Sequence, residues 1–169
     1  MRTLSGRVVV AVVAVACAVS WRTFAQTKPA EPPAGPTVEA TGEAKRVLHD
    51  IEGYRSWPKF SRYEKGPKQS KGHGGTFVVA HYNEVAARAV RDSASGFSDG
   101  SVLVKENRPQ ADAEPASLTT MAKLNGAWFW VKSTPDGKVF TAKGKPLAGA
   151  VQGCIGCHVQ APRDMVFSE

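Results

Sequence analysis

Hydrophobic and polar positions recur with different periods along the chain, and these periods predict most of its elements. From residue 41 to residue 53, apolar side chains recur at helical spacing until Gly53 ends the helix. Runs of β-branched and aromatic residues predict four strands, at 76–83, 101–106, 127–132 and 139–141. A short helix is predicted at 84–92, whereas 116–124 leads into the third strand and is given no element.

Turn residues separate the predicted strands. The segment Ser95–Gly100 is rich in glycine and serine, and Thr134–Gly137 contains a proline that presets φ and a glycine that accepts a positive φ. No heptad pattern is sustained, which argues against a helical bundle. The pattern therefore predicts an α+β fold, mainly an antiparallel β-sheet with a few flanking helices.

The first 25 residues predict a secretory signal peptide. Two arginines precede the apolar run Val8–Ser20, and small residues surround a cleavage point after Ala25. The run is short for a membrane span. Two alternatives stay open, an uncleaved membrane anchor and a lipoprotein signal processed at Cys17.

Residues 26–41 are rich in proline and poor in large apolar side chains, so they predict a linker, and 42–169 is the predicted folded domain. The formal net charge of the sequence is +7, and it falls to +4 when the three arginines of residues 1–25 are removed. The remaining basic residues form no cluster, so no nucleic-acid partner is expected.

The strongest chemical signal is Cys154-Ile-Gly-Cys157-His158, because C-x-x-C-H is the attachment motif of a c-type haem. Two thiols three residues apart on a helical turn can each add across one haem vinyl group. The adjacent histidine then offers a nitrogen to the iron. We expect Cys154 and Cys157 to bind one haem covalently, at the C-terminal end of the fold, and His158 to be the proximal iron ligand.

Other uses of a C-x-x-C pair are a redox dithiol, half of a zinc site and a structural disulfide. A zinc site needs two further ligands, and no other Cys or His pair in the chain supplies them. Loss of Cys17 with a cleaved signal leaves only the two motif cysteines, which suits an oxidising compartment. Haem attachment and export therefore support each other.

Two methionines are candidates for a second axial ligand. Met165 follows His158 by seven residues, and Met121 precedes the third strand. An apolar packing role suits both better. Without a methionine ligand the iron has an open face for small molecules, whereas plain electron transfer needs a second strong ligand.

The order of several segments resembles the cytochrome P-460 and cytochrome c-prime-beta family. These segments are His73-Gly74, the strand ending Tyr82-Asn83, Ser95–Glu106, Met121–Trp130, the haem motif and Asp164–Phe167. The resemblance covers residues 57–167. It implies a mainly β homodimer with one covalent haem c per chain and an open distal face. The P-460 branch oxidises hydroxylamine and nitric oxide, and the c-prime-beta branch binds nitric oxide and carbon monoxide.

The resemblance also suggests residues for the distal side. Glu106 is a candidate acid or base, and His81 is a candidate hydrogen-bond donor to a bound ligand. The alternative for each is a solvent-facing strand residue with no role in the site. Phe77 and Phe97 are candidates to line the pocket.

The P-460 branch carries a lysine bonded to the haem edge, which we expect near 77–82. This chain has no lysine there, while Lys71 and Lys105 lie on either side of that strand. We therefore expect no cross-link.

These observations predict a periplasmic mono-haem cytochrome that binds nitric oxide or a related small N–O or diatomic ligand. The alternatives are a hydroxylamine or nitric oxide oxidoreductase of the P-460 type and a simple electron-transfer cytochrome. A redox-active form needs a periplasmic electron-transfer partner.

Overall fold

The computed structural model describes residues 37–167, so the predicted signal peptide and most of the predicted linker lie outside the described residues. The helices are α1 (Gly42–Asp50), α2 (Glu84–Arg91) and α3 (Gln152–His158), and three 3₁₀ turns are η1 (Tyr54–Ser56), η2 (Ser61–Tyr63) and η3 (Lys71–His73). No helix within the described part is long and apolar enough to cross a membrane.

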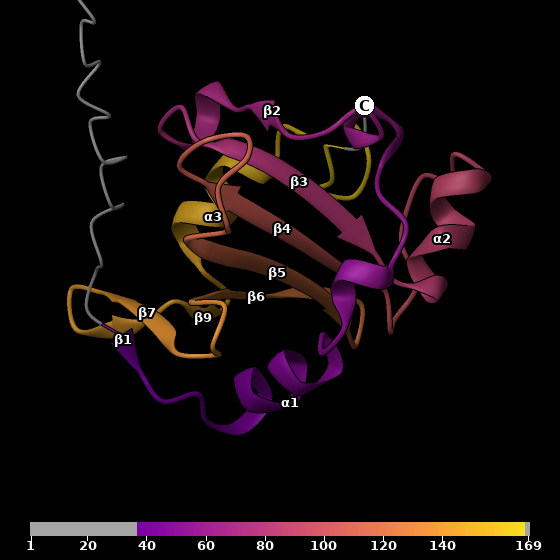
Figure 1. Cartoon of the computed structure of the whole chain (residues 1–169). Helices are drawn as coiled ribbons and strands as arrows, with labels where there is room; N and C mark the ends of the chain where they lie inside the picture. Colours follow the sequence, from indigo (N-terminus) through magenta and orange to yellow (C-terminus); the bar gives the residue numbers. More distant parts are fainter. Residues whose placement is uncertain (1–36, 168–169) are drawn as a thin grey trace, which may run out of the picture.

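The strands form one antiparallel sheet in the order β1-β7-β6-β5-β4-β3-β2, with β8 paired to β7 and β9 to β6 (Figure 1). Their bounds are β1 Thr37–Val38, β2 Lys68–Gln69, β3 Phe77–Tyr82, β4 Val102–Arg108, β5 Ser117–Leu124, β6 Ala127–Ser133, β7 Val139–Ala142, β8 Lys145–Pro146 and β9 Ala148–Gly149. The predicted α+β class, mainly antiparallel sheet, is confirmed.

The central meander corrects the sequence analysis at β5, a full strand where no element was assigned. Leu124 pairs with Ala127 across a two-residue turn in which Asn125 and Gly126 have φ of 50° and 77°. Asn-Gly is a strong hairpin signal, because both central residues of the turn need a positive φ. This signal was present at 125–126. Strand β1 likewise lies within the predicted linker and pairs with β7.

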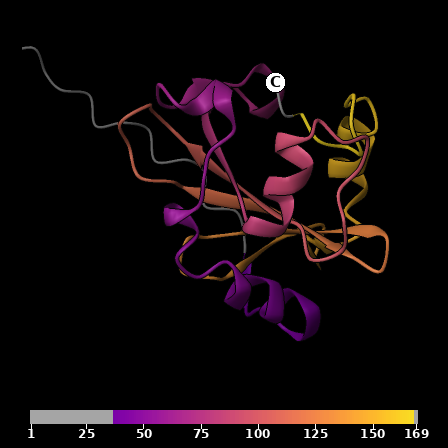
Figure 2. The ribbon, with the colours of Figure 1, turned by 90° about the vertical axis from the view of Figure 1, so that its right-hand side faces the viewer.

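Two apolar clusters cover opposite faces of the sheet, because side chains alternate along each strand. Val102 and Val104 of β4 pack with Ala44 and Val47 of α1 on one face. On the other face Leu103 packs with residues of α2, the loops and the C-terminal segment. Figures 1 and 2 show α1 away from α3, with α3 behind the sheet in the first view.

Asn83 ties three elements together at the end of β3. Its side-chain oxygen accepts hydrogen bonds from Ala86 N and Val102 N, both at 3.0 Å, and its amide donates to Gly100 O at 2.8 Å. The residue caps α2 and aligns the start of β4 in the same contacts. This fixes β3 and β4, the strands that carry one wall of the cavity described below.

Candidate functional site

Helix α3 presents the C-x-x-C-H motif on the second face of the sheet. Cys154 and Cys157 are one turn apart, and both thiols are unpaired. Cys154 is partly buried against the apolar cluster, whereas Cys157 is exposed and lines a cavity. Within residues 37–167, no group of three or more His, Cys, Asp or Glu side chains is arranged to hold a metal ion. The two thiols therefore have no further protein ligands at hand for a zinc site.

The ring of His158 is held in one orientation. Its Nδ1 lies 2.7 Å from the carbonyl oxygen of Met165, and its faces contact Trp130 and Phe167 at ring-centroid distances of 4.7 and 5.3 Å. Burial lowers the pKa of His158, which favours the neutral ring. With Nδ1–H donated to a carbonyl, Nε2 carries the free lone pair that a metal ion requires.

The carbonyl behind His158 belongs to a left-handed turn, in which Asp164 and Met165 have φ of 43° and 63°. The Asp164 carboxylate accepts hydrogen bonds from Lys123 Nζ at 2.8 and 2.9 Å and from Phe97 N at 3.0 Å. Its backbone carbonyl accepts a bond from Trp128 Nε1 at 2.8 Å. Asp164 thus fastens the turn to the sheet. The backbone carbonyl of Met165 lies on the Nδ1 side of His158, and its side chain packs against the apolar cluster.

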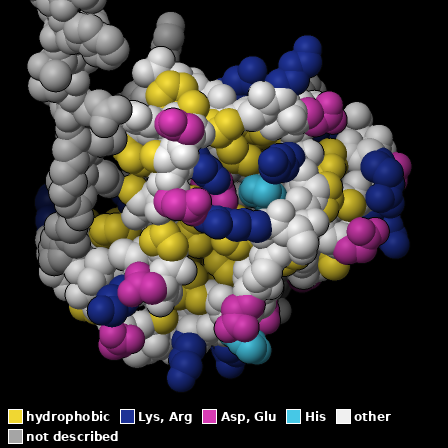
Figure 3. Space-filling model, in the orientation of Figure 1, with side chains coloured by type: hydrophobic (Ala, Val, Ile, Leu, Met, Phe, Trp, Pro, Cys, Tyr) yellow, Lys and Arg dark blue, Asp and Glu magenta, His cyan; other side chains and the backbone are white. Residues whose placement is uncertain are grey.

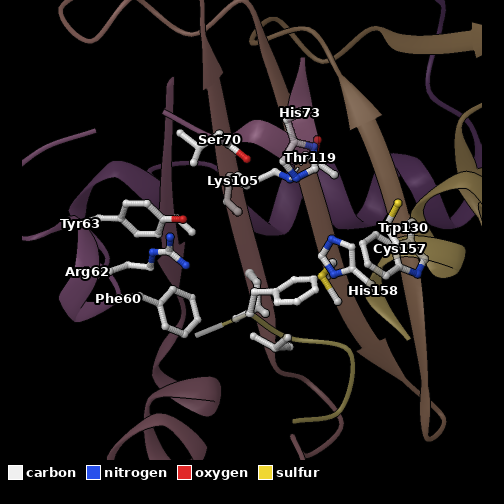
Figure 4. A pocket seen from close by; sticks show the side chains of 18 of the residues that line it. Phe60, Arg62, Tyr63, Ser70, His73, Lys105, Thr119, Trp130, Cys157 and His158 are labelled. Atoms are coloured by element: carbon white, nitrogen blue, oxygen red, sulfur yellow. Dashed lines mark hydrogen bonds between the residues drawn. The ribbon is translucent and has the colours of Figure 1, made fainter. Parts of the chain in front are cut away.

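A cavity of about 590 Å³ begins at Cys157 and His158. Its walls come from η2, the 69–73 loop, strands β3 to β6 and the C-terminal segment, and it is lined by Phe60, Arg62, Tyr63, Gln69, Ser70, Gly72, His73, Val78, Ala80, Leu103, Val104, Lys105, Thr119, Met121, Trp130, Cys157, His158, Gln160, Val166 and Phe167. Figure 4 shows the ring of His158 at one end of the cavity and Phe60, Arg62 and Tyr63 across it. None of these lining residues is an aspartate or glutamate.

These features fit a haem. The volume lies within the range of pockets that bind organic ligands and cofactors. Most of the wall is apolar, as a porphyrin requires, and Arg62 and Lys105 supply positive charge for a cofactor that carries two carboxylates. An unprotonated imidazole nitrogen and the Cys157 thiol stand at one end of this cavity, and the Cys154 thiol lies one helical turn from Cys157. His158, Cys154 and Cys157 would hold the group.

The structure also places a pair in the cavity that the sequence analysis did not identify as a site. Lys105 Nζ lies 2.6 Å from His73 Nε2, and both residues line the cavity, His73 at its open side (Figure 4). The 3₁₀ turn η3 ends at His73, and Gly74 and Gly75 follow with φ of 66° and 78°. Two consecutive left-handed residues are readily available only to glycine. In the sequence, the Gly74-Gly75 pair indicates a tight turn directly after His73.

Burial explains the protonation of this pair. It lowers the pKa of Lys105 to about 8, and burial together with the Lys105 charge lowers the pKa of His73 to about 4. At pH 7 the histidine is therefore neutral and accepts a hydrogen bond from the protonated lysine.

Glu106 does not reach this cavity. It is 1% exposed on the opposite face of β4, where it accepts hydrogen bonds from Tyr54 Oη at 2.8 Å and from Arg108 Nε at 2.8 Å. Arg55 approaches the same carboxylate at 3.4 Å. Burial, first of all, raises the pKa of Tyr54 to about 12, so the phenol stays a hydrogen-bond donor. The arrangement corrects the distal-acid hypothesis, because successive strand residues point to opposite faces and Lys105, not Glu106, faces the cavity.

His81 lies with Glu106 on that opposite face. Its Nδ1 is 3.2 Å from the carbonyl oxygen of Trp57, its ring contacts Tyr54, and burial lowers its pKa. The two predicted distal residues line a separate pocket of about 200 Å³. Figure 3, in the orientation of Figure 1, shows basic and acidic side chains gathered around a histidine on this face. The distal hydrogen-bond role expected for His81 is therefore not supported by its position.

The two predicted pocket phenylalanines also lie outside the cavity lining. Phe77 is on the same face of β3 as Val79 and His81, whereas Val78 and Ala80 line the cavity. Phe97 is buried in the apolar cluster beside Trp128, at a centroid distance of 5.6 Å. Phe60, from a segment that the sequence analysis gave no role in the site, is the phenylalanine opposite His158.

Comparison with known proteins supports one family. No curated protein matches the chain. The family model described as Cytochrome P460 matches residues 51–168, a span that contains the cavity-lining strands, the 69–73 loop and the C-x-x-C-H helix. This is the family that the order of sequence segments resembles, and its members are haem cytochromes. With the model matching well over half of its length, the chain belongs to the cytochrome P460 family.

Proposed function

We propose that this protein is an exported mono-haem c-type cytochrome whose iron keeps one axial position open for nitric oxide or a related small N–O or diatomic ligand. The observation that carries the proposal is the cavity extending beyond the orientated ring of His158. His158, Cys154 and Cys157 would hold the haem, whose iron would supply the site that binds a small ligand in the cavity.

The residues of the chain have separate tasks in this proposal. Each motif thiol adds across a vinyl group, so that its sulfur bonds to one vinyl carbon and its hydrogen goes to the other. His158 donates Nε2, and the carbonyl of Met165 keeps that ring from rotating. Phe60 and Leu103 line the apolar part of the cavity and limit access of water.

The open position is proposed because the side chains in the cavity that could compete for the iron have other contacts. Met121 lines the cavity but packs within the apolar cluster, and His73 Nε2 is bound by Lys105. Hydroxylamine oxidation is the less favoured alternative, since the reaction releases protons and no carboxylate is among the lining residues that the structure describes. His73, with its pKa lowered to about 4, is a weak base.

Covalent attachment is tested by extracting the exported, haem-loaded protein with acidified acetone. We expect the haem to stay with the polypeptide, and haem moving to the organic phase contradicts the thioether bonds. In His158→Ala the haem should remain attached while the ligand-field spectrum changes. An unchanged spectrum excludes His158 as the ligand.

The enzyme alternative is tested by hydroxylamine turnover and by the mass of the haem-peptide. We expect slow turnover and a haem joined to the Cys154–Cys157 peptide alone. Lys105 is a lysine that lines the cavity, so a second bond to the peptide containing Lys105 would favour the P-460 type of oxidoreductase. The matched Lys105→Met variant would then lose that bond.

Export and assembly are also part of the proposal. The pattern of residues 1–25 supports a periplasmic location. The homodimer rests on the resemblance to the family and stays a prediction.

A further inference from the structure

Lys105 lines the cavity, and the described residues that line it with Lys105 include no aspartate or glutamate. Lys105 is half-buried in this lining, with its ammonium against His73. The neutral histidine accepts one hydrogen of the ammonium and does not balance its charge.

The ammonium keeps two N–H donors after the contact with His73. Figure 4 shows Ser70 and Thr119 beside this pair, and both hydroxyls line the same cavity. Several donors therefore lie around one point of the cavity wall. Hydrogen bonds from a charged donor to an anion are stronger than those between neutral groups.

Lys105 is placed rigidly and within electrostatic range of the motif. It stands on β4 between Ala80 of β3 and Thr119 of β5, in the middle of the sheet. Lys105 and His158 line the same cavity, so a small ligand bound in that cavity experiences the charge of Lys105.

We propose that Lys105 and His73 form an anion-binding subsite in the haem cavity, which extends the ligand class from neutral diatomic gases to small inorganic anions of the size of nitrite or azide. This inference rests on the proposed function, because the subsite is useful only beside a haem. Lys105 supplies charge and donors, and His73 is a positioning residue that keeps the ammonium directed along the cavity wall.

The test is a spectral titration of the ferric holoprotein with sodium nitrite and with sodium azide, for wild type and Lys105→Met. Methionine has a similar length and no charge. We expect the dissociation constants of both anions to rise about 10- to 100-fold, as for a lost charge-assisted hydrogen bond. Carbon monoxide affinity of the ferrous protein should change by less than about 3-fold, because a neutral ligand gains little from the ammonium.

Lys132→Met is the matched control. Lys132 belongs to the same cross-strand row, through the pairs Lys105–Thr119 and Thr119–Lys132, but it does not line the cavity. It stands two strand spacings, roughly 10 Å, from Lys105. Its charge acts on Lys105 and His73 through space, but it offers no hydrogen bond inside the cavity. Removing that charge should therefore weaken anion binding by less than about 3-fold, well below the loss in Lys105→Met. Lys105→Arg should recover much of the affinity.

The two failures are distinguishable. A wild-type haem protein that binds neither carbon monoxide nor nitric oxide overturns the proposed function and this inference together. Normal carbon monoxide binding with equal anion affinities in wild type and Lys105→Met overturns the inference alone, and shows that Lys105 serves another partner such as a haem carboxylate. An equal loss in the Lys132→Met protein also overturns it, because the effect is then one of net charge.

Discussion

Replacing Asp164 by asparagine removes the negative charge that fastens the turn behind the proximal histidine. The carboxylate contacts Lys123 Nζ at 2.8 and 2.9 Å, and the two side chains are 20% and 11% exposed. A fully buried pair that loses one partner costs about 3–5 kcal/mol, and an exposed pair about 0–1 kcal/mol. With this partial exposure, we expect the free energy of unfolding to fall by about 2–3 kcal/mol.

This loss can be converted to a thermal shift. The entropy of unfolding is about 2.1 cal/mol/K per residue, so for roughly 130 ordered residues the midpoint should fall by about 7–11 °C. Circular dichroism of the holoprotein measures it. Lys123→Met should lower the midpoint, and adding Asp164→Asn to it should lower the midpoint less than the same change does in wild type. Asp99→Asn is the matched control, an exposed aspartate whose Oδ1 accepts one hydrogen bond from Gly126 N at 2.8 Å.

A second readout separates positioning from stability. If Asp164 sets the carbonyl that binds His158 Nδ1, Asp164→Asn should lower the iron–histidine stretching frequency in resonance Raman spectra, because a looser hydrogen bond makes the imidazole a weaker donor. Lys123→Met should shift it less, since Phe97 N still binds the carboxylate. A midpoint within 2 °C of wild type, together with an unshifted frequency, would refute the reasoning.

Two further predictions concern the two faces of the sheet. Glu106→Gln should lower the free energy of unfolding by about 2–4 kcal/mol, because Arg108 loses its buried counter-charge, while carbon monoxide affinity stays within about 2-fold of wild type. Urea unfolding measures the first effect and a carbon monoxide titration the second. A large loss of carbon monoxide affinity would show that Glu106 acts on the distal side. Azide affinity should fall as the pH rises through about 8, because Lys105 is protonated below that pKa and loses its charge above it, whereas carbon monoxide affinity should stay flat. An azide profile that is equally steep in Lys105→Met would assign the titration to another group.

The fold class and the haem-attachment end of the site were predictable from the sequence. Periodicity located β3, β4, β6 and β7 and the helices α1 and α2, because each has a strong local pattern. The motif at 154–158 carries its chemistry in its spacing alone. Strand β5 was not predicted, although Asn125-Gly126 is a typical turn sequence for the hairpin that joins β5 and β6.

The distal side was not predictable, because it depends on which face of β4 meets the cavity. Residues 101–104 are all buried, so the burial pattern of the strand does not reveal its inner face. A shift by one residue exchanges Lys105 for Glu106. The pairing of Lys105 with His73, 32 residues away, has no local signal beyond the Gly74-Gly75 turn that follows His73. The same holds for Asp164, whose partners Phe97 and Lys123 come from distant segments.

The most direct test of the account is a titration of the dithionite-reduced holoprotein with nitric oxide, followed by absorption spectroscopy. We expect a high-spin, five-coordinate ferrous spectrum that converts completely to that of the nitric oxide complex at one nitric oxide per chain, because the cavity beyond His158 leaves an axial position open. A low-spin, six-coordinate ferrous spectrum that nitric oxide leaves unchanged would contradict it, and would show that a side chain such as His73 or Met121 occupies that position.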